Sequence, residues 1–145
     1  MAIPAIPTAH PNHRFRVEID GVANLDFSEV ILPEARTDVV EYREGGNVSP
    51  RKISGPVHYS NLVLRRGVTT SNDLFNWWKT VADGQMNRRN MAVILLDEQR
   101  NEVKRWNIHD AWPTHYLVSP LIARDGETVV TETLECAVDR FETAS

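Results

Sequence analysis

The chain has 145 residues, of which 41% are hydrophobic and 25% are charged, proportions that are ordinary for a globular domain. Its formal net charge of -4 gives no support to a nucleic-acid binder, because such proteins usually carry a basic domain. The single cysteine, Cys136, excludes an intrachain disulfide and favours a reducing compartment. The N-terminus lacks the features of a signal peptide, and the longest apolar run, Met91 to Leu96, is far shorter than the ~20 residues that a membrane helix needs. We therefore expect one domain over residues 1–145 that does not insert into a membrane.

The first part of the chain is predicted to form an arm followed by short strands. Residues 1–12 contain three prolines, which exclude a helix and favour an extended N-terminal arm. The next segment, Phe15–Asp20, alternates apolar and polar residues, as a strand with one buried face does. In the second strand this alternation slips near Ser28, which indicates a bulge or a change of face. The four strands expected here cover Phe15–Asp20, Leu25–Leu32, Thr37–Glu44 and Val57–Arg66.

The segment between the third and fourth strands, residues 45–56, is far longer than a hairpin turn requires. It begins with Gly45-Gly46, a pair that tolerates positive φ, and it contains Ser49-Pro50 and Gly55-Pro56. Long ordered loops tend to be functional, because their backbone groups must find hydrogen-bond partners. We expect this loop to find those partners on another copy of the protein.

One helix is predicted over residues 71–83. Thr70 and Asp73 have the spacing of a capping box, and Gly84 is placed to end the helix in a left-handed conformation. The helix should pack against the outside of the sheets, because its two indoles would bury a large apolar area. Its apolar stripe consists of Leu74, Trp77, Trp78 and Val81.

The remaining segments are predicted to be strands. Met91–Leu96 is apolar on both faces and is expected to be a central strand. In Val103–Trp112 the side chains of Trp106, Ile108 and Trp112 are expected on one face, and Pro113 is expected to end the strand. Asp125-Gly126 favours a two-residue hairpin turn. The last two strands are expected over His115–Ala123 and Thr128–Phe141.

The last strand has an apolar face and a polar face. Leu134 and Cys136 belong to the apolar face, which Glu132 interrupts. Thr133 and Glu135 belong to the polar face. In total about eight strands and one helix are expected, which favours a β-sandwich or barrel.

The chain shows no strong catalytic or ligand-binding signal. His10 and His13 have a spacing suited to a metal, but no third ligand lies nearby in the sequence. A triad of His109 with Ser119 or Cys136 lacks a nucleophile elbow or any other local signature. We therefore predict a protein that is not an enzyme and that has no cofactor or metal site.

One glycine pair and two arginine pairs are also interpreted as structural features. Gly45-Gly46 is not followed by the Gly-Lys-Ser/Thr of a phosphate loop. The basic pairs Arg65-Arg66 and Arg88-Arg89 are expected to form salt bridges to a neighbour, with phosphate binding as the alternative.

Six short motifs occur in the chain in a characteristic order: Phe27–Val30, Glu41–Asn47, Tyr59–Gly67, Leu74–Trp78, Leu95–Asp97 and Trp106–Pro113. Together they resemble the tail tube proteins of contractile phages and of phage-tail-like contractile injection systems. The resemblance implies the tail tube fold, in which six subunits form a ring and rings stack into a hollow inner tube. It also implies a contractile sheath around the tube, a baseplate, tube-terminating proteins, and a cargo that is delivered through a target envelope on contraction. Assembly would occur in the bacterial cytoplasm.

The resemblance assigns three sets of residues to surfaces of such a tube. Residues of the long loop are expected to contact the next ring: Glu44, Gly45, Gly46, Asn47, Arg51, Lys52 and Gly55. The polar face of the last strand is expected to line the lumen through Thr131, Thr133 and Glu135. The exposed face of the helix is expected to meet the sheath through Asp73, Asn76 and Lys79.

Alternatives to this assignment stay open at this point. One is a small-molecule-binding β-barrel with Trp106 and Trp112 lining a pocket, and another is a hydrolase that uses His109 or His115. The particle could be a phage tail or an injection system. The chain could also be the main tube subunit or a paralogue used near the baseplate.

Overall fold

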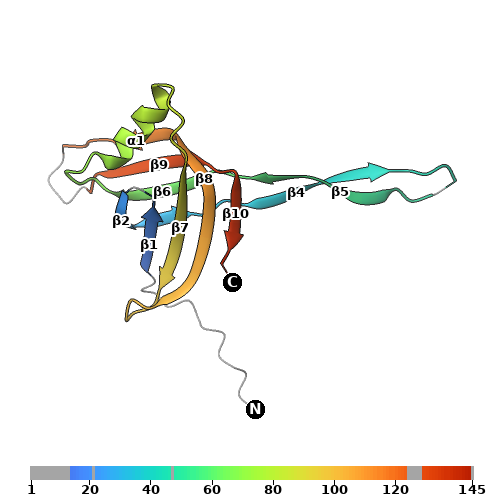
Figure 1. The fold of residues 1–145 in the computed structure, drawn as a ribbon, viewed down its shortest axis with the longest axis horizontal. Coiled ribbons are helices and arrows are strands. Elements are labelled where there is room, and N and C mark those ends of the chain that lie inside the picture. Colours follow the sequence, from blue (N-terminus) through green and yellow to red (C-terminus); the bar gives the residue numbers. More distant parts are fainter. Residues whose placement is uncertain (1–13, 21, 47, 124–128, 145) are drawn as a thin grey trace, which may run out of the picture.

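The structure is a computed structural model that describes residues 14–20, 22–46, 48–123 and 129–144 (Figure 1). Within these ranges, no helix is long and apolar enough to cross a membrane. The N-terminal arm, Asn47 and the Asp125-Gly126 turn lie outside the described residues. The elements are β1 (Arg14–Ile19), β2 (Val22–Phe27), β3 (Glu29–Ile31), β4 (Ala35–Tyr42), β5 (Arg51–Tyr59), β6 (Leu62–Gly67), α1 (Asp73–Ala82), β7 (Arg89–Leu96), β8 (Glu102–Val118), β9 (Thr131–Ala137) and β10 (Arg140–Thr143).

Eight of the strands form one curled antiparallel sheet in the order β2-β1-β7-β8-β9-β6-β3, with β10 also paired to β8. β2 and β3 lie at the two ends of this order, yet only Ser28 separates them in the sequence. The backbone N–H of Ser28 donates to the carbonyl of Arg65, 2.9 Å away, so the chain changes partner strand at this residue. The predicted change of face near Ser28 is therefore confirmed. Because β2 and β3 are adjacent in the chain, the sheet curls toward a closed barrel, and one helix flanks it. The expected mainly β fold with a flanking helix is confirmed.

The 17-residue strand β8 joins the two halves of the barrel. Its first half pairs with β7 and β10, and its second half pairs with β9. The prediction that Pro113 ends this strand is wrong. Between the halves Asp110 has a φ of 55°, and the pairing with β9 shifts register after Pro113. In its second half, β8 pairs with β9 along one edge, and its other edge has no partner strand among the described residues. Pro113 lacks a backbone N–H, but no ladder of hydrogen bonds on that free edge requires one.

The unusual backbone at Asp110 also changes which side chains of β8 face inward. Ile108 and Ala111 are fully buried, whereas Trp112 is only half-buried. The prediction that Trp112 shares a face with Trp106 and Ile108 is wrong, because the left-handed residue shifts the alternation by one position.

The C-terminal segment forms two strands where one long strand was predicted. β9 ends at Ala137, and β10 begins at Arg140 and pairs with the first half of β8. The N–H of Asp139 donates to the carbonyl of His109 at 3.0 Å, which carries the chain from one half of the barrel to the other. The period-2 pattern of Leu134 and Cys136 is confirmed, since both are fully buried.

Helix α1 begins later than its sequence indicates. The N-cap residue is Asn72, without a side-chain capping bond, so the capping box at Thr70 is wrong. The carboxylate of Asp73 accepts the N–H of Leu74 at 3.0 Å instead, and its negative charge favours this end of the helix. The predicted end is confirmed, because Gly84 has a φ of 92°.

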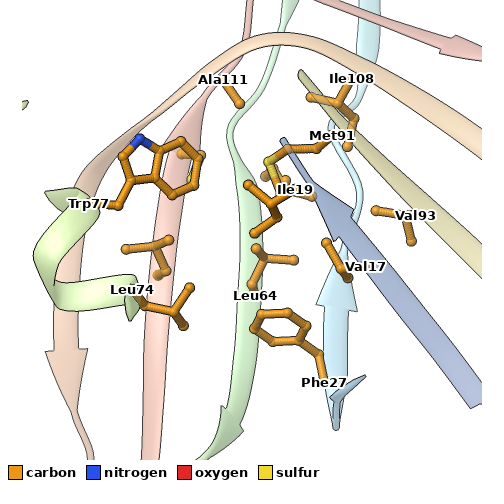
Figure 2. Close-up of a cluster of buried hydrophobic side chains, with 13 residues drawn as sticks. Val17, Ile19, Phe27, Leu64, Leu74, Trp77, Met91, Val93, Ile108 and Ala111 are labelled. Carbon is orange, nitrogen blue, oxygen red and sulfur yellow. The ribbon is translucent and has the colours of Figure 1, made fainter. Parts of the chain in front are cut away.

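The core lies between the two halves of the barrel and under α1. Figure 2 shows Leu74 and Trp77 pointing from the helix toward interior side chains such as Leu64 and Ile19. The indole N–H of Trp77 donates to the carbonyl of Asn87 at 2.8 Å, so this large buried ring leaves no unpaired donor. The buried cluster consists of Val17, Ile19, Phe27, Leu62, Leu64, Leu74, Trp77, Met91, Val93, Ile108, Ala111, Leu134 and Cys136.

Candidate assembly surfaces

A two-stranded ribbon extends from the barrel well beyond its core (Figure 1). It consists of β4 and β5, and it continues the pairing of β3 with β6 without a change of register. Ile31 pairs with Val63, and Ala35 pairs with Tyr59. At the root, the N–H of Ser60 donates to the carbonyl of Glu34 at 3.1 Å. The hairpin, defined here as residues 35–59, therefore projects along the strand direction of β6.

The hairpin replaces the long loop that was predicted from the sequence. Arg51, Lys52 and Gly55 lie within strand β5, so their assignment to a loop is wrong. Only residues 43–50 connect the two strands, and the strand predicted over Val57–Arg66 is divided at Ser60 and Asn61. The prolines and glycines of this segment are accommodated because both faces and both edges of the ribbon are free of other strands among the described residues.

Both faces of the hairpin carry exposed apolar side chains. Val40 pairs with Ile53 on one face, and Val39 pairs with Ser54 on the other. Their exposed fractions are large, for example 63% for Val39 and 50% for Ile53. A hairpin with only two strands is marginally stable in water, so such a ribbon needs a covering surface to hold one conformation. The hairpin is therefore a candidate assembly surface.

Gly55 allows a bulge in the middle of the hairpin. The register shifts between Thr37 and Val39, opposite Gly55. A Cβ atom at Gly55 would lie 3.0 Å from Cγ2 of Val40 and 3.2 Å from Cβ of Asp38. By contrast, a Cβ at Gly45 would meet nothing within 4 Å. The close approach of β4 therefore requires a glycine at position 55, whereas position 45 has room for a side chain.

Polar contacts order the rest of the hairpin. The imidazole Nε2 of His58 lies 2.8 Å from Oδ2 of Asp38, across the two strands. The hydroxyl of Tyr42 donates to Oε1 of Glu44 at 3.2 Å, next to the turn in which Gly46 has a φ of 98°. Lys52 is the cross-strand partner of Glu41.

The second candidate surface is the outer face of the sheet formed by β3, β6, β9 and the second half of β8. Thr131, Thr133 and Glu135 point away from the core, because the alternate residues of β9 are buried. The guanidinium of Arg65 donates to Oγ1 of Thr133 at 3.1 Å and to Glu29 at 2.8 Å. Thr133 is consequently only 9% exposed, and Glu135 is the more accessible of these positions. Asn61 donates to Glu135 at 2.9 Å.

Helix α1 lies on the opposite side of this sheet. Leu74 and Trp77 belong to the same buried cluster as the inward-facing side chains of β6 and β9, and the helix lies beside β8. Asn76 and Lys79 are exposed on the outer side of the helix. Asp73 is half-buried and is bound to Arg66 at 2.7 Å, so it serves the subunit itself.

A buried ionic network joins α1 to the sheet. Arg66 donates through Nε to Glu132 at 2.6 Å and through Nη2 to Asp73 at 2.7 Å. Glu132 also accepts the hydroxyl of Tyr116 at 2.6 Å. The side chains of Arg66 and Glu132 are 7% and 4% exposed. One feature of the sequence pointed to this network, namely the acidic residue Glu132 within the apolar face of β9.

The environment of the network shifts the pKa values of Tyr116 and Asp73 in opposite directions. Burial and then the hydrogen bond to Glu132 raise the pKa of Tyr116 to about 12. Burial alone would raise the pKa of Asp73, but the hydrogen bonds from Arg66 and Ser71 and the charge of Arg66 outweigh it, and the pKa is lowered.

The basic pairs find partners within the subunit. Arg65 and Arg66 bind Glu29 and Glu132, and Arg88 binds Asp139 at 2.9 Å. The guanidinium of Arg89 lies 4.9 Å from the ring centroid of Trp77, where a cation–π contact forms. The salt bridges expected for Arg65, Arg66 and Arg88 are therefore present, and their partners lie within the same subunit.

The residues considered for catalysis lie in structural contacts. Nε2 of His109 is 2.8 Å from Glu142, and Arg140 is 3.2 Å away. Oγ of Ser119 accepts the N–H of Thr131 at 2.9 Å. Cys136 is buried, and burial raises the pKa of its thiol to about 12. The metal pair suggested for His10 and His13 lies outside the described residues, and within them no group of three potential ligands is placed to hold a metal ion.

A family model described as T4-like virus tail tube protein gp19 matches residues 11–142. The chain belongs to this family. The recognition of a tail tube protein from its sequence motifs is thereby confirmed. No curated protein sequence matches the chain.

Solved structures of tube proteins share this fold. A chain from the PVC sheath-tube complex in the extended state is 22% identical, with a TM-score of 0.84 over 97% of this tail tube protein and 94% of that chain. A chain of the anti-feeding prophage baseplate is 23% identical, with a TM-score of 0.78 over 99% and 97%. Hcp1 from Flavobacterium johnsoniae is 15% identical, with a TM-score of 0.59 over 90% and 94%.

The protein is a structural tail tube protein, and a small-molecule-binding barrel is not favoured. Trp106, which was considered as a pocket residue, packs against the core cluster. Trp112 lines a shallow cleft beside the end of α1, together with Val81 and Met86. The two indoles therefore do not share the interior pocket that the alternative required.

Proposed function

We propose that six copies of this tail tube protein form a ring and that rings stack head to tail into a hollow inner tube. The tube lies within a contractile sheath, starts at a baseplate and ends at a terminating protein. On contraction it carries cargo through a target envelope as a passive conduit, without catalysis. Subunits assemble in the bacterial cytoplasm.

The projecting hairpin carries this proposal. Its exposed apolar side chains and its free edges suit a contact with another copy, and nothing in the part of the subunit that the structure describes covers them. Contacts between different surfaces of identical subunits either close into a ring or continue as a filament, and a tube uses both. We assign the stacking contact to Glu44, Gly45, Gly46, Asn47, Arg51, Lys52 and Gly55. Of the described members, Gly55 shapes the hairpin and the others lie at or near its tip.

Partners of related proteins support the surrounding assembly. The similar PVC chain comes from a sheath-tube complex, and other similar chains come from a baseplate and from a tube terminating cap of the anti-feeding prophage. We assign the sheath contact to the exposed residues Asn76 and Lys79, with Asp73 as a support of the helix.

The outer face of β9 is assigned to the lumen, opposite the helix. Its polar groups are already paired, as Thr133 is with Arg65 and Glu135 is with Asn61. Paired short polar groups offer few free contacts to a passing cargo, which suits a conduit. Thr131 completes this set.

Imaging of the purified protein tests the proposal. We expect negative-stain class averages with sixfold symmetry at high protein concentration, and long tubes once a baseplate seed is added. Association should be favoured because it covers apolar side chains that the free subunit exposes. A protein that stays monomeric in size-exclusion chromatography, with and without the seed, would contradict it.

Thiol labelling of assembled tubes tests the assignment of inner and outer faces. A bulky polymer-linked maleimide should label Lys79→Cys on intact tubes but should label Glu135→Cys only after the tubes are dissociated. The native Cys136 provides a low background, because it is buried and its pKa of about 12 keeps it protonated at neutral pH. Labelling of Glu135→Cys on intact tubes, with protection of Lys79→Cys, would reverse the assignment.

A further inference from the structure

The imidazole of His109 has two contacts that no single hydrogen-bonding state of the ring can satisfy. Its Nε2 lies 2.8 Å from Oε1 of Glu142 and 3.2 Å from Nη2 of Arg140. A carboxylate only accepts hydrogen bonds and a guanidinium only donates them. The contact with Glu142 therefore needs a proton on Nε2, whereas the contact with Arg140 needs a lone pair on the same atom. The ring must favour one of these partners at the expense of the other.

Strand β10 holds both partners on one face, beside His109. Arg140 is the cross-strand partner of His109. Glu142 lies two residues further along β10 and therefore on the same face. The N–H of Asp139 donates to the carbonyl of His109 at 3.0 Å, which fixes where β10 begins. The side chain of His109 is 28% exposed and that of Glu142 is 47% exposed, so the pair can exchange protons with the solvent.

The other charged side chains on the strands around this imidazole have other partners or are exposed. Asp139 binds Arg88 at 2.9 Å. Arg105, on the same face of β8, binds carboxylates of β1 and β8 at 3.2 Å and 2.8 Å. Asp110 is exposed, and on β7 the neutral amide of Asn90 accepts its N–H at 3.2 Å. The balance at the imidazole is thus set by the two charged side chains of β10.

We infer that His109, Arg140 and Glu142 form a proton-dependent switch that selects which charged side chain β10 presents to the solvent. Only a neutral ring with its proton on Nδ1 can accept from Arg140, and this ring leaves Glu142 without its donor. A protonated ring has no lone pair, so it binds the carboxylate and repels the guanidinium. The exposed charge of β10 therefore changes from anionic to cationic as the pH falls through the range in which imidazoles gain a proton.

The ionisation of Glu142 supports this pairing. The hydrogen bond from His109 lowers the pKa of the Glu142 carboxyl, and the charges of Arg140 and His109 act in the same direction. Glu142 consequently stays ionised over the range in which imidazoles gain a proton. The protonated ring then meets a carboxylate, which accepts its hydrogen bond.

Crystal structures of the unmodified protein at about pH 5.5 and about pH 8.5 test the geometry of the switch. At the lower pH, Glu142 should stay within hydrogen-bond distance of Nε2 of His109, while the guanidinium of Arg140 moves beyond about 3.5 Å. At the higher pH, Arg140 should lie within hydrogen-bond distance and Glu142 should turn away. The same positions of all three side chains at both pH values would overturn the inference.

An NMR titration of the Cε1–H signal of His109 tests the competition between the two partners. Arg140→Met removes the repelling cation and should raise the pH midpoint of this titration by about half a unit or more. Glu142→Gln should lower the midpoint by a similar amount, because the ring loses its anionic partner. Both positions are exposed, so the subunit should tolerate these changes.

Two controls accompany the titration. Arg140→Lys keeps a positive charge beside His109, so its midpoint should stay close to that of the unmodified protein. The midpoint of His115 should not change in any variant, because Nδ1 of His115 faces Glu135, at 3.8 Å, on another part of β8. Equal midpoints of His109 in Arg140→Met and in the unmodified protein would overturn the inference, and so would a shift of the same size in Arg140→Lys.

Discussion

Tubes are expected to disappear when Val40–Ile53 is replaced with Asn-Gly, while the folded subunit remains. Most of the removed residues that the structure describes are exposed, and none of them belongs to the buried core cluster. Val39 and Ser54 remain and are cross-strand partners, so the shortened strands end level with each other and a two-residue Asn-Gly turn can join them. We expect the unfolding temperature to change by only about 2 °C, as for other surface changes. Negative-stain imaging and thermal unfolding measure the two effects.

Gly45→Ala provides a control within the same hairpin. A Cβ at this position would meet nothing within 4 Å, so the variant should still form tubes of normal length. Long tubes from the shortened hairpin would show that rings stack through another surface. That result would remove the role proposed for Glu44, Arg51 and Lys52.

The parts of the fold that were predicted correctly are those whose apolar side chains are buried within the subunit itself. Val17 and Ile19 alternate with polar residues, and both are buried inside the barrel. Trp77 follows the helical period and is 1% exposed. In each case, burial within the chain imposes the period on the sequence.

The hairpin was not predicted, because nothing among the described residues of the subunit covers it. Both of its faces mix polar and apolar residues, so the sequence contains no alternation between a core face and a solvent face. Its proline and glycine residues then favoured a loop. The bend in β8 was missed for a different reason, since it depends on the positive φ of Asp110, and a single aspartate within a strand-like segment does not by itself indicate that conformation.

The buried network was not predicted because its members are far apart in the sequence. Arg66 and Glu132 are separated by 66 positions, and only the pairing of β6 with β9 brings them together. Arg66 also binds Asp73 at the start of α1, which follows β6 in the chain. The network thus holds the helix that presents Asn76 and Lys79 against the sheet that we assign to the lumen.

Arg66→Met is expected to lower the free energy of unfolding by about 3–5 kcal/mol at pH 7, because it leaves the buried carboxylate of Glu132 without its cation. Urea denaturation measures this loss. Arg65→Met is a matched control on the neighbouring residue. Its ion pair with Glu29 is about 40% exposed on both sides, and such a pair contributes only about 0–1 kcal/mol.

A second substitution separates the lost ion pair from the lost packing. Arg66→Met combined with Glu132→Leu removes both buried charges and should recover much of the stability that Arg66→Met loses. A similar loss in the double variant would indicate that packing of the arginine, which also lies 5.7 Å from the ring centroid of Phe27, is the larger effect. A loss below about 1 kcal/mol for Arg66→Met would contradict the importance of the network.

The pH dependence of stability provides an independent check on the same network. The pKa of Asp73 is lowered in the folded state, so its stabilising contribution is present above the unfolded pKa of about 4 and is lost as the pH falls further. The pKa of Tyr116 is raised to about 12, so its contribution is present below pH of about 10 and is lost as the pH rises toward 12. Arg66→Met should therefore weaken the acid dependence, and Tyr116→Phe should weaken the alkaline dependence. Profiles that match the unmodified protein at both extremes would mean that these groups do not form the contacts described here in solution.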